Sequence, residues 1–512
     1  MPSGGVAAPS VLQVDVRRRQ ATRIFHFLRV FLAVAIATCS IAPIFLHNHP
    51  VIMSTNNQSL HPFLRSPRSS SHTVKLPKLP SNIGGAGRYL LLRALEKRPV
   101  WDEDIDPIIE AERCSKYFSY LNSTYTYANY NPTRTKRRRV FLGSLLIADD
   151  SWHALAAIAM EIYGIYTAVA FVEGNRTQTG SPRTLRFVNG TVEHTILVES
   201  NLFGPTTPVL VEQFAHEGKI VGKGLIREQM QRSMIIDMWK KAGMTPDDIG
   251  VLTDADETPT RDFLRAMQIC DIPQLDHKKQ NCHTAKLIVA SMVFEGSPEC
   301  MTITRKWMHP DLILGKCIEG IGDEEYKLTD NQRQQKLAWR KREYTYKYGN
   351  YSGWSKEKKT FPLWNPADFR RDQGGHVIMF ENVSYLNFGM GHTGYHFHNY
   401  FETTTQLRTK YMTYGHPVKE AENMSIGEMH PDLDVMVDCV LGRSSTNNKH
   451  NVSSVKLVDF KGRIPVAYEV LDGYTSARHL ELEKILKEDV MGHDRTWHDN
   501  PKSSTWFENI PP

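Results

Sequence analysis

The chain has 512 residues and a formal net charge of +6, with 41% hydrophobic and 23% charged residues. This composition is ordinary for a folded protein, and the length is sufficient for one large domain or two. The positive charge is concentrated in short runs, Arg17–Arg19 and Lys136–Arg139, and does not follow one face, which argues against a nucleic-acid-binding protein.

An apolar segment near the N-terminus predicts a membrane anchor. Val30–Leu46 is seventeen residues long without a formal charge, and together with residues 24–29 it is long enough to cross a bilayer. Arginines on its N-terminal side favour a cytosolic tail, residues 1–23, followed by a signal anchor, residues 24–46, of a single-pass type II protein. The alternative is a cleaved signal peptide with its exit site among the small residues Ala37–Ala42.

The segment after the anchor is rich in Ser, Pro and Asn, which predicts a flexible stem over residues 47–100. Six cysteines follow, an even set that can form disulfides in an oxidising lumen, with fifteen possible connectivities. Eight Asn-x-Ser/Thr sites also fit a lumenal body, at Asn57, Asn122, Asn175, Asn189, Asn350, Asn382, Asn423 and Asn451.

The pattern from residue 140 onward predicts an α/β fold. A strand over Val140–Ile147, a helix from Ser151 to about Ile162 and a strand over Thr167–Val172 form a βαβ unit. A helix over Leu225–Lys241 precedes the next strand. We therefore expect a mostly parallel sheet flanked by helices, within a domain over residues 101–475, followed by a C-terminal helical tail over residues 476–512.

The most informative segment joins a strand to a group of acids. Ile249–Thr253 is apolar, and Asp254, Asp256 and Glu257 follow at its carboxyl end, where open α/β sheets bind ligands. Carboxylate oxygens suit Mg²⁺ or Mn²⁺, which can bridge the phosphates of a nucleotide. A turn is needed to bring Asp254 and Asp256 to one ion, and we expect Thr258 as N-cap and Pro259 as first helical residue to supply it.

The order of several motifs resembles glycosyltransferase family 17, which contains the transferase that adds the bisecting GlcNAc to N-glycans. The resemblance covers about residues 138–420 and rests on Phe171–Gly180, on Arg227-Glu228 with Arg232, on Asp254-x-Asp256-Glu257-x-Pro259, on Gly394-Tyr395-His396, and on Lys410 with Gly415-His416-Pro417. Tyr395 stands where the family has Trp, and Gly415 where it has Ser, which puts the acceptor specificity in doubt.

The resemblance implies a GT-A-like fold, UDP-GlcNAc as donor, a divalent ion (Mn²⁺ or Mg²⁺), and a mannose of N-glycans on glycoproteins as acceptor, joined in β-1,4 linkage with inversion. It also implies a Golgi membrane protein with a lumenal catalytic domain. The candidate donor-binding residues are Glu173, Asn175, Arg227, Arg232 and Asp254, and the candidate metal ligands are Asp254, Asp256, His396 and His416. Asn175 is also a glycosylation site, and only one of its two roles can hold.

An inverting transfer needs a base for the acceptor proton. Asp256 and Glu257 are the candidate catalytic residues, and Glu295, Glu402 and Asp432 are further possible bases that the sequence does not rank. Rings at Tyr395, Phe397, Tyr400 and Phe401 suit either a sugar or a core.

Two other functions fit the same sequence. Asp254-x-Asp256-x-Thr258 also resembles the nucleophile motif of haloacid-dehalogenase-like phosphatases, in which Asp254 attacks phosphorus. The other alternative is a membrane-anchored sugar-binding protein without turnover.

Overall fold

The chain divides into two units, residues 1–67 and 68–512, and the second contains all residues that the structure describes. None of the described helices is both long and apolar enough to cross a bilayer, and the predicted anchor, residues 24–46, lies outside the described part. The structure is a computed structural model that describes residues 79, 83, 85–96, 106–118, 130, 136–147, 150–215, 225–275, 282, 285–322, 370, 376–378, 393–414, 417–418, 420–442, 452–454 and 474–496.

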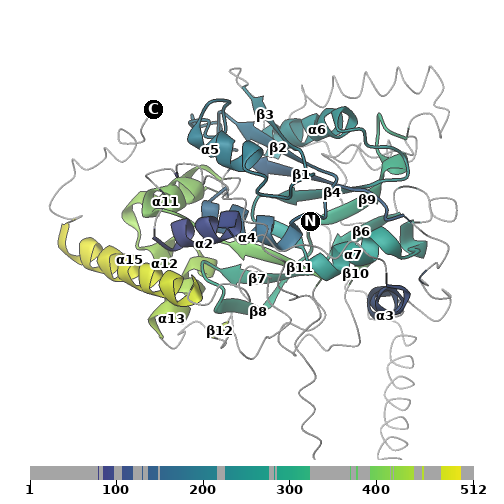
Figure 1. Cartoon of the computed structure of the whole chain (residues 1–512). Helices are drawn as coiled ribbons and strands as arrows, with labels where there is room; N and C mark the ends of the chain where they lie inside the picture. Colours follow the sequence, from purple (N-terminus) through teal and green to yellow (C-terminus); the bar gives the residue numbers. More distant parts are fainter. Residues whose placement is uncertain are drawn as a thin grey trace, which may run out of the picture. The chain divides into compact units, whose positions relative to one another are not determined.

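The centre of the second unit is a seven-stranded sheet of order β10-β6-β9-β4-β1-β2-β3 (Figure 1). Strands β4, β1, β2 and β3 are parallel, as are β10 and β6, and only β9 runs against its neighbours. The predicted α/β class and mostly parallel sheet are therefore confirmed. The strands are β1 (Val140–Leu146), β2 (Ala168–Gly174), β3 (Val209–Phe214), β4 (Ile249–Asp254), β6 (Lys286–Val289), β9 (Asp311–Leu314) and β10 (His376–Ile378).

Helices cover both faces of this sheet because its strands are apolar on both. In β1, Leu142 packs into one core cluster and Phe141 into another, as the two-residue period of a strand requires. Helix α6 (Leu225–Lys241) covers the Phe141 face, while α4 (Trp152–Ile162) and α7 (Arg261–Ile269) contribute to the cluster on the other. Gly143 permits the close approach of α6, since a Cβ there would lie 2.3 Å from Ile235.

A second, five-stranded sheet of order β12-β8-β7-β11-β5 adjoins the first and was not predicted. It is mostly antiparallel, with β7 and β11 as its parallel pair. The chain passes from the first sheet to the second between β4 and β5, so the acids of this link lie where the sheets join. The strands are β5 (Glu257–Pro259), β7 (Ser291–Glu295), β8 (Cys300–Trp307), β11 (Gly394–His398) and β12 (Val452–Ser454).

The turn after β4 differs from the sequence prediction. Thr258 and Pro259 belong to strand β5, which pairs with β11, and Thr260 is the residue that caps α7. The Thr260 hydroxyl accepts a hydrogen bond from the backbone N–H of Phe263 at 3.2 Å. The predicted helix start was wrong because pairing with a strand about 140 residues later in the chain overrides a local capping signal.

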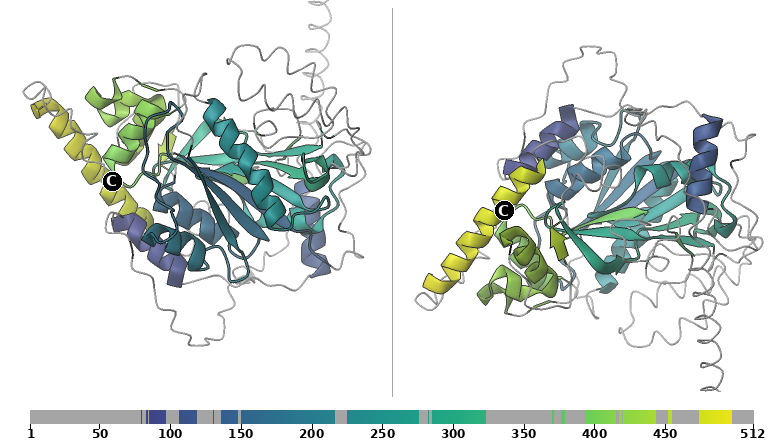
Figure 2. Two further views of the ribbon diagram at one scale, coloured as in Figure 1. Left: turned by 90° about the horizontal axis from the view of Figure 1, so that it is seen from above. Right: turned by 90° about the horizontal axis from the view of Figure 1, so that it is seen from below.

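Helices from both ends of the unit pack together beside the sheets (Figure 2). Helix α2 (Gly85–Glu96) buries Leu90 and Leu91 completely and contacts α4 and α15 (Tyr474–Thr496). Residues 85–96 are therefore part of the body, although the sequence predicted a stem there.

The remaining described helices are α3 (Pro107–Phe118), α5 (Val192–His194), α11 (Thr404–Thr413), α12 (Ile426–Met429) and α13 (Pro431–Leu441). Short π or 3-10 turns lie at Thr195–Glu199, Pro273–Leu275, Gly315–Cys317 and Ala421–Asn423.

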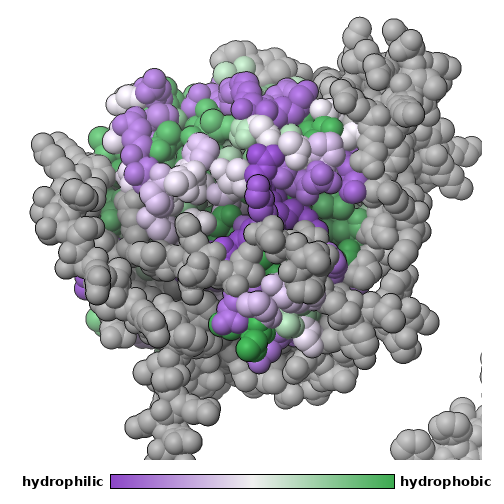
Figure 3. Space-filling model, turned by 45° about the vertical axis from the view of Figure 1, so that its right-hand side comes forward, coloured by the Kyte–Doolittle hydropathy of each residue, from purple (hydrophilic) through white to green (hydrophobic). Residues whose placement is uncertain are grey.

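The six cysteines after the predicted anchor form three disulfides, Cys114–Cys270, Cys282–Cys317 and Cys300–Cys439. Pairing was expected, while the connectivity comes from the structure alone. Each bond joins segments that are distant in sequence, and Cys300–Cys439 ties strand β8 to helix α13. On the face shown in Figure 3, hydrophilic and hydrophobic residues are interspersed over the described surface.

Candidate active site

The acids predicted from the sequence lie at the carboxyl end of β4 and the start of β5. Asp254 is the last residue of β4, and Glu257 is the first of β5. Strand β4 is parallel to β1 and occupies the side of β1 opposite β2, so its carboxyl end lies at the point where the strand order reverses. Ligands of open α/β sheets bind at such a point.

Asp254 is fixed by two arginines. Its carboxylate accepts hydrogen bonds from Arg232 of α6 at 3.0 Å and from Arg370 at 2.5 Å. Arg232 also forms the predicted ion pair with Glu228, one helical turn earlier, and the Gln178 amide donates to Glu228 at 2.5 Å. The Asp254 side chain nevertheless keeps 26% of its surface exposed, so it remains accessible to a ligand.

Glu257 is buried and surrounded by donors. Arg370 donates to both of its oxygens, at 2.7 and 2.8 Å, the Trp307 indole donates at 2.6 Å, and the Asp254 backbone N–H donates at 3.1 Å. Burial raises the pKa of a carboxyl, but the Arg370 charge and its hydrogen bonds outweigh burial here and hold the pKa of Glu257 well below its usual range. Glu257 is therefore a permanently ionised partner of Arg370 and a weak base.

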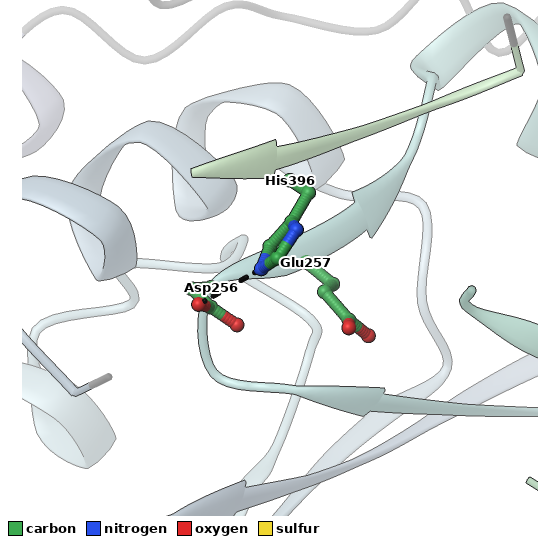
Figure 4. Close-up of side chains that lie close together, drawn as sticks. All are labelled: Asp256, Glu257 and His396. Carbon is green, nitrogen blue, oxygen red and sulfur yellow. Dashed lines mark hydrogen bonds and ion pairs between the residues drawn. The ribbon is translucent and has the colours of Figure 1, made fainter. Parts of the chain in front are cut away.

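Asp256 and His396 form the third part of the site (Figure 4). The His396 Nε2 lies 3.2 Å from Asp256 Oδ2, both side chains are at most 4% exposed, and the imidazole stacks on Trp307 with ring centroids 4.5 Å apart. Burial raises the pKa of Asp256 well above its usual value, Lys410 opposes this shift, and the charges of Glu257 and Asp254 add to it.

The register of the second sheet explains how His396 reaches the acids. In the antiparallel pair of β11 and β5, His396 lies directly opposite Glu257, and the Phe397 backbone N–H donates to the Asp256 carbonyl at 2.7 Å. One ligand atom each from Asp256, Glu257 and His396 lies within 4.8 Å of the others, a group with the spacing of a cation site. We name these three residues the first cluster.

The chemistry of the first cluster fits a divalent cation held by Asp256 and His396. Carboxylate oxygen and imidazole nitrogen suit Mn²⁺, whereas the oxygens of Glu257 and Asp254 already accept hydrogen bonds from arginine. Asp254 is not among the three residues of this group, and the pairing of Asp254 and Asp256 as joint ligands of one ion stays a prediction. His416 lies outside the described residues.

The remaining predicted donor-binding residues have different surroundings. Glu173 ends up fully buried, where it accepts hydrogen bonds from the backbone N–H groups of Arg186 at 2.6 Å and Phe187 at 3.0 Å, and so anchors a loop. Burial and the positive charge of Arg176 lower the pKa of Arg227. The side chain of Asn175 is only partly exposed, and its Oδ1 is buried.

The three alternative bases, Glu295, Glu402 and Asp432, do not all lie in the same surroundings. Glu402 lies 3.5 Å from Arg186 and accepts the backbone N–H of Trp152 at 2.8 Å, which gives it a structural role. Glu295 and Asp432 instead lie together beside His398. The rings predicted to suit a sugar or a core are core residues, each at most 5% exposed: Tyr395, Phe397, Tyr400 and Phe401.

Sequence reasoning missed Arg370, Trp307 and His398. Arg370 contacts Asp254 and Glu257 across more than a hundred residues, and no local pattern marks it. For His398 a signal existed, because His396 and His398 are two residues apart in a strand and must share a face.

Comparison with known proteins supports the family resemblance. Residues 89–283 match the model of glycosyltransferase family 17, and this range contains Asp254, Asp256 and Glu257. The suspected resemblance is thereby confirmed over this segment, and the match implies glycosyltransferase activity. No curated protein matches the chain.

Proposed function

We propose that this chain, with its glycosyltransferase family 17 segment, transfers N-acetylglucosamine from UDP-GlcNAc to a mannose of N-glycans on glycoproteins, in β-1,4 linkage and with inversion. The observation that carries the proposal is the placement of Asp254 and Asp256, inside the matched segment, at the switch point of the parallel strands. The parallel order β3-β2-β1-β4 supports a GT-A-like, nucleotide-binding assignment for this half of the sheet.

The proposed transfer exchanges one bond at the anomeric carbon for another and moves one proton. An acceptor hydroxyl oxygen bonds to the anomeric carbon while the bond from that carbon to the diphosphate oxygen breaks, UDP leaves with the bonding electrons, and a base takes the hydroxyl proton. A Mn²⁺ ion held by Asp256 and His396 would stabilise the negative charge that develops on the diphosphate.

The other residues have positioning and binding roles in this proposal. Glu257 holds Arg370 in place and does not accept the proton, because its pKa is lowered and its oxygens are occupied. Arg370 and Arg232 in turn orient Asp254, whose exposed edge accepts a hydrogen bond from a hydroxyl of the donor. Arg227 supplies positive charge for the diphosphate.

The test is incubation of the purified full-length chain in detergent with Mn²⁺, an N-glycan acceptor, and UDP-GlcNAc, UDP-Gal or UDP-Glc in parallel. We expect the mass of the acceptor to increase by one N-acetylglucosamine, with UDP-GlcNAc as the best donor. Faster use of another donor would reject the stated activity and leave the family match intact. Glycan binding without transfer would favour the sugar-binding alternative.

The phosphatase alternative predicts different chemistry. A nucleophilic Asp254 would hydrolyse a phosphate monoester and leave a trapped aspartyl-phosphate. We expect neither product, because two arginines already engage the Asp254 carboxylate. Detection of the phosphorylated peptide by mass spectrometry would replace the transferase proposal with the phosphatase.

We also propose that the protein is a single-pass type II protein of the Golgi membrane with its catalytic domain in the lumen. Among the described sequons, Asn189 and Asn423 are exposed, whereas Asn175 is only partly so. Glycopeptide mass spectrometry should find glycans on Asn189 and Asn423 and an unmodified Asn175. Absence of glycans from Asn189 and Asn423 would contradict a lumenal body.

A further inference from the structure

We propose that Glu295, His398 and Asp432 form a second cation site, distinct from the first cluster, that takes Zn²⁺ or Mn²⁺. We name these residues the second cluster. One ligand atom from each lies within 4.8 Å of the others. The residues come from β7, β11 and the first turn of α13, so a bound ion would join the second sheet to the helical layer.

The sheet register brings two of the three ligands together. In the parallel pair of β11 and β7, His398 is the register partner of Glu295. The His398 Nδ1 lies 2.9 Å from Glu295 Oε2 and 3.8 Å from Asp432 Oδ2. Ligands at roughly 2.0–2.2 Å from a tetrahedral zinc ion lie roughly 3.3–3.6 Å apart, and the two measured distances bracket this range.

Helix α13 delivers the third ligand because it approaches β7 closely. Gly296, directly after Glu295, has a positive φ of +67°, and a Cβ there would lie 2.3 Å from the Met436 sulfur. Met436 is one turn after Asp432 in α13, so this contact holds the start of the helix against the end of the strand. The Cys300–Cys439 disulfide fixes the same helix to β8.

The electrostatic environment favours a cation. Glu295 is 1% exposed and Asp432 is 11% exposed at their side chains, and a buried carboxylate requires a compensating charge or hydrogen bonds. The Asn399 amide donates to Glu295 at 3.0 Å, while its oxygen accepts from Lys410 at 3.3 Å and from Tyr411 at 3.0 Å. Such outer contacts orient ligands around a metal ion.

The donor types indicate which ions fit. One imidazole nitrogen with two carboxylate oxygens suits Zn²⁺ or Mn²⁺, while Mg²⁺ prefers an all-oxygen octahedron. The second cluster lies next to the first, since the His396 and His398 rings are 5.0 Å apart on the same face of β11. An ion here would hold β11 in position and thereby support His396 without taking part in the transfer.

The test measures zinc binding without any sugar substrate, so its outcome does not depend on the proposed transferase activity. The full-length protein in detergent is stripped with chelator, dialysed against Zn²⁺ and analysed for bound zinc per chain by mass spectrometry of the metal. We expect wild type to retain one zinc ion more than His398→Gln and one more than Asp432→Asn. Equal zinc content in wild type and both variants would overturn the proposal.

A matched control is available at His479. Its Nδ1 lies 2.5 Å from Glu299 Oε1, a histidine–glutamate contact like that of the second cluster, but the pair belongs to neither group of three ligands. His479→Gln should retain as much zinc as wild type. A loss of zinc in His479→Gln equal to that in His398→Gln would show a nonspecific effect and count against the site.

A second measurement keeps the proposal testable if the His398 variant misfolds. Asp256→Asn removes a ligand of the first cluster and leaves the second intact, so zinc that remains specifically bound in this variant is assigned to the second cluster. X-ray absorption of that zinc should show a four-coordinate ion with an imidazole ligand. A zinc shell without imidazole, or zinc content no higher than in the doubly substituted Asp256→Asn/Asp432→Asn protein, would reject the assignment.

Discussion

The two clusters are built on the same strand from the same residue types, yet their glutamates have different partners. In the first cluster, His396 lies opposite Glu257, and Arg370 donates to both oxygens of that carboxylate. In the second cluster, His398 lies beside Glu295, which accepts from the neutral amide of Asn399. The comparison shows that residues of ligand type must be judged by the groups that already contact their carboxylates. In our proposals, Asp256 and His396 hold the ion of the first cluster, and all three residues hold the ion of the second.

Arg370→Met should cause the largest change, because it breaks the buried ion pair between Arg370 and Glu257 of the first cluster. Removal of one partner leaves the Glu257 charge buried, and loss of a buried partner typically costs about 3–5 kcal/mol. The free energy of unfolding in urea should fall by about that amount. Lys241→Met is the control, since its pair with Glu212 is exposed and its loss should leave the unfolding curve unchanged. Equal effects of the two substitutions would show that burial of the Arg370 pair is energetically unimportant.

Asp256→Asn should abolish most of the transfer while the fold persists. Loss of a group that stabilises developing charge typically lowers the rate by about 10²–10³-fold, and raised Mn²⁺ should recover part of it by mass action. Transfer rates at several Mn²⁺ concentrations measure both effects. Asp237→Asn, an exposed position on α6, is the matched control and should transfer normally. Near-normal transfer rates for Asp256→Asn would contradict the proposal that the first cluster holds the metal ion.

Zinc should stabilise the chain through the second cluster independently of transfer. A site with free ligand at about 100 times Kd adds about 2.7 kcal/mol to the free energy of unfolding. We expect Asp432→Asn to lose this increment while His479→Gln keeps it, as measured by urea unfolding with and without Zn²⁺. If zinc stabilises Asp432→Asn as much as wild type, the proposal that the second cluster binds zinc is wrong.

Gly296→Ala should lower the zinc affinity of the second cluster, and it should lower the free energy of unfolding less than the substitutions above. The added methyl group meets the Met436 sulfur, and overpacking of this kind typically costs about 1–3 kcal/mol. Helix α13 must then move from β7, so zinc affinity should fall, as titration calorimetry would detect. Met436→Ala in the same chain should restore part of the affinity because it removes the clash. No change in affinity for Gly296→Ala would show that the approach of α13 does not set the site.

Strands β1, β2 and β4 of the first sheet were predictable because their signals are local, whereas β3, β6, β9 and β10 were not predicted. The apolar run of β1, the Ser151 cap of α4 and the full extent of α6 lie in short windows of sequence, and each prediction agrees with the structure. Predictions failed where distant segments meet. Residues 85–96 read as a stem because their partners, α4 and α15, lie elsewhere in the chain, and Thr258 read as a helix cap because its partner strand β11 does.

The candidate site likewise has a part that could be predicted from the sequence and a part that could not. Asp254, Asp256 and His396 were named from the sequence, since acids after an apolar strand are a local pattern and Gly394-Tyr395-His396 resembles a family motif. Glu257 is an ionised partner of Arg370 and not an available base. This depends on contacts with Arg370 and Trp307, which lie in other segments of the chain. The pairing of Glu295 with His398 likewise depends on the register between β7 and β11.

The sequence by itself determined the α/β class, the family resemblance and the acids at the end of β4, because strand periodicity, capping and motif order are written in consecutive residues. Only the tertiary structure decided which carboxylates are neutralised by arginine, which lie beside histidine, and how the six cysteines pair. The physical reason is that burial and charge neutralisation depend on distances between side chains, and strand register and helix packing set those distances across hundreds of residues.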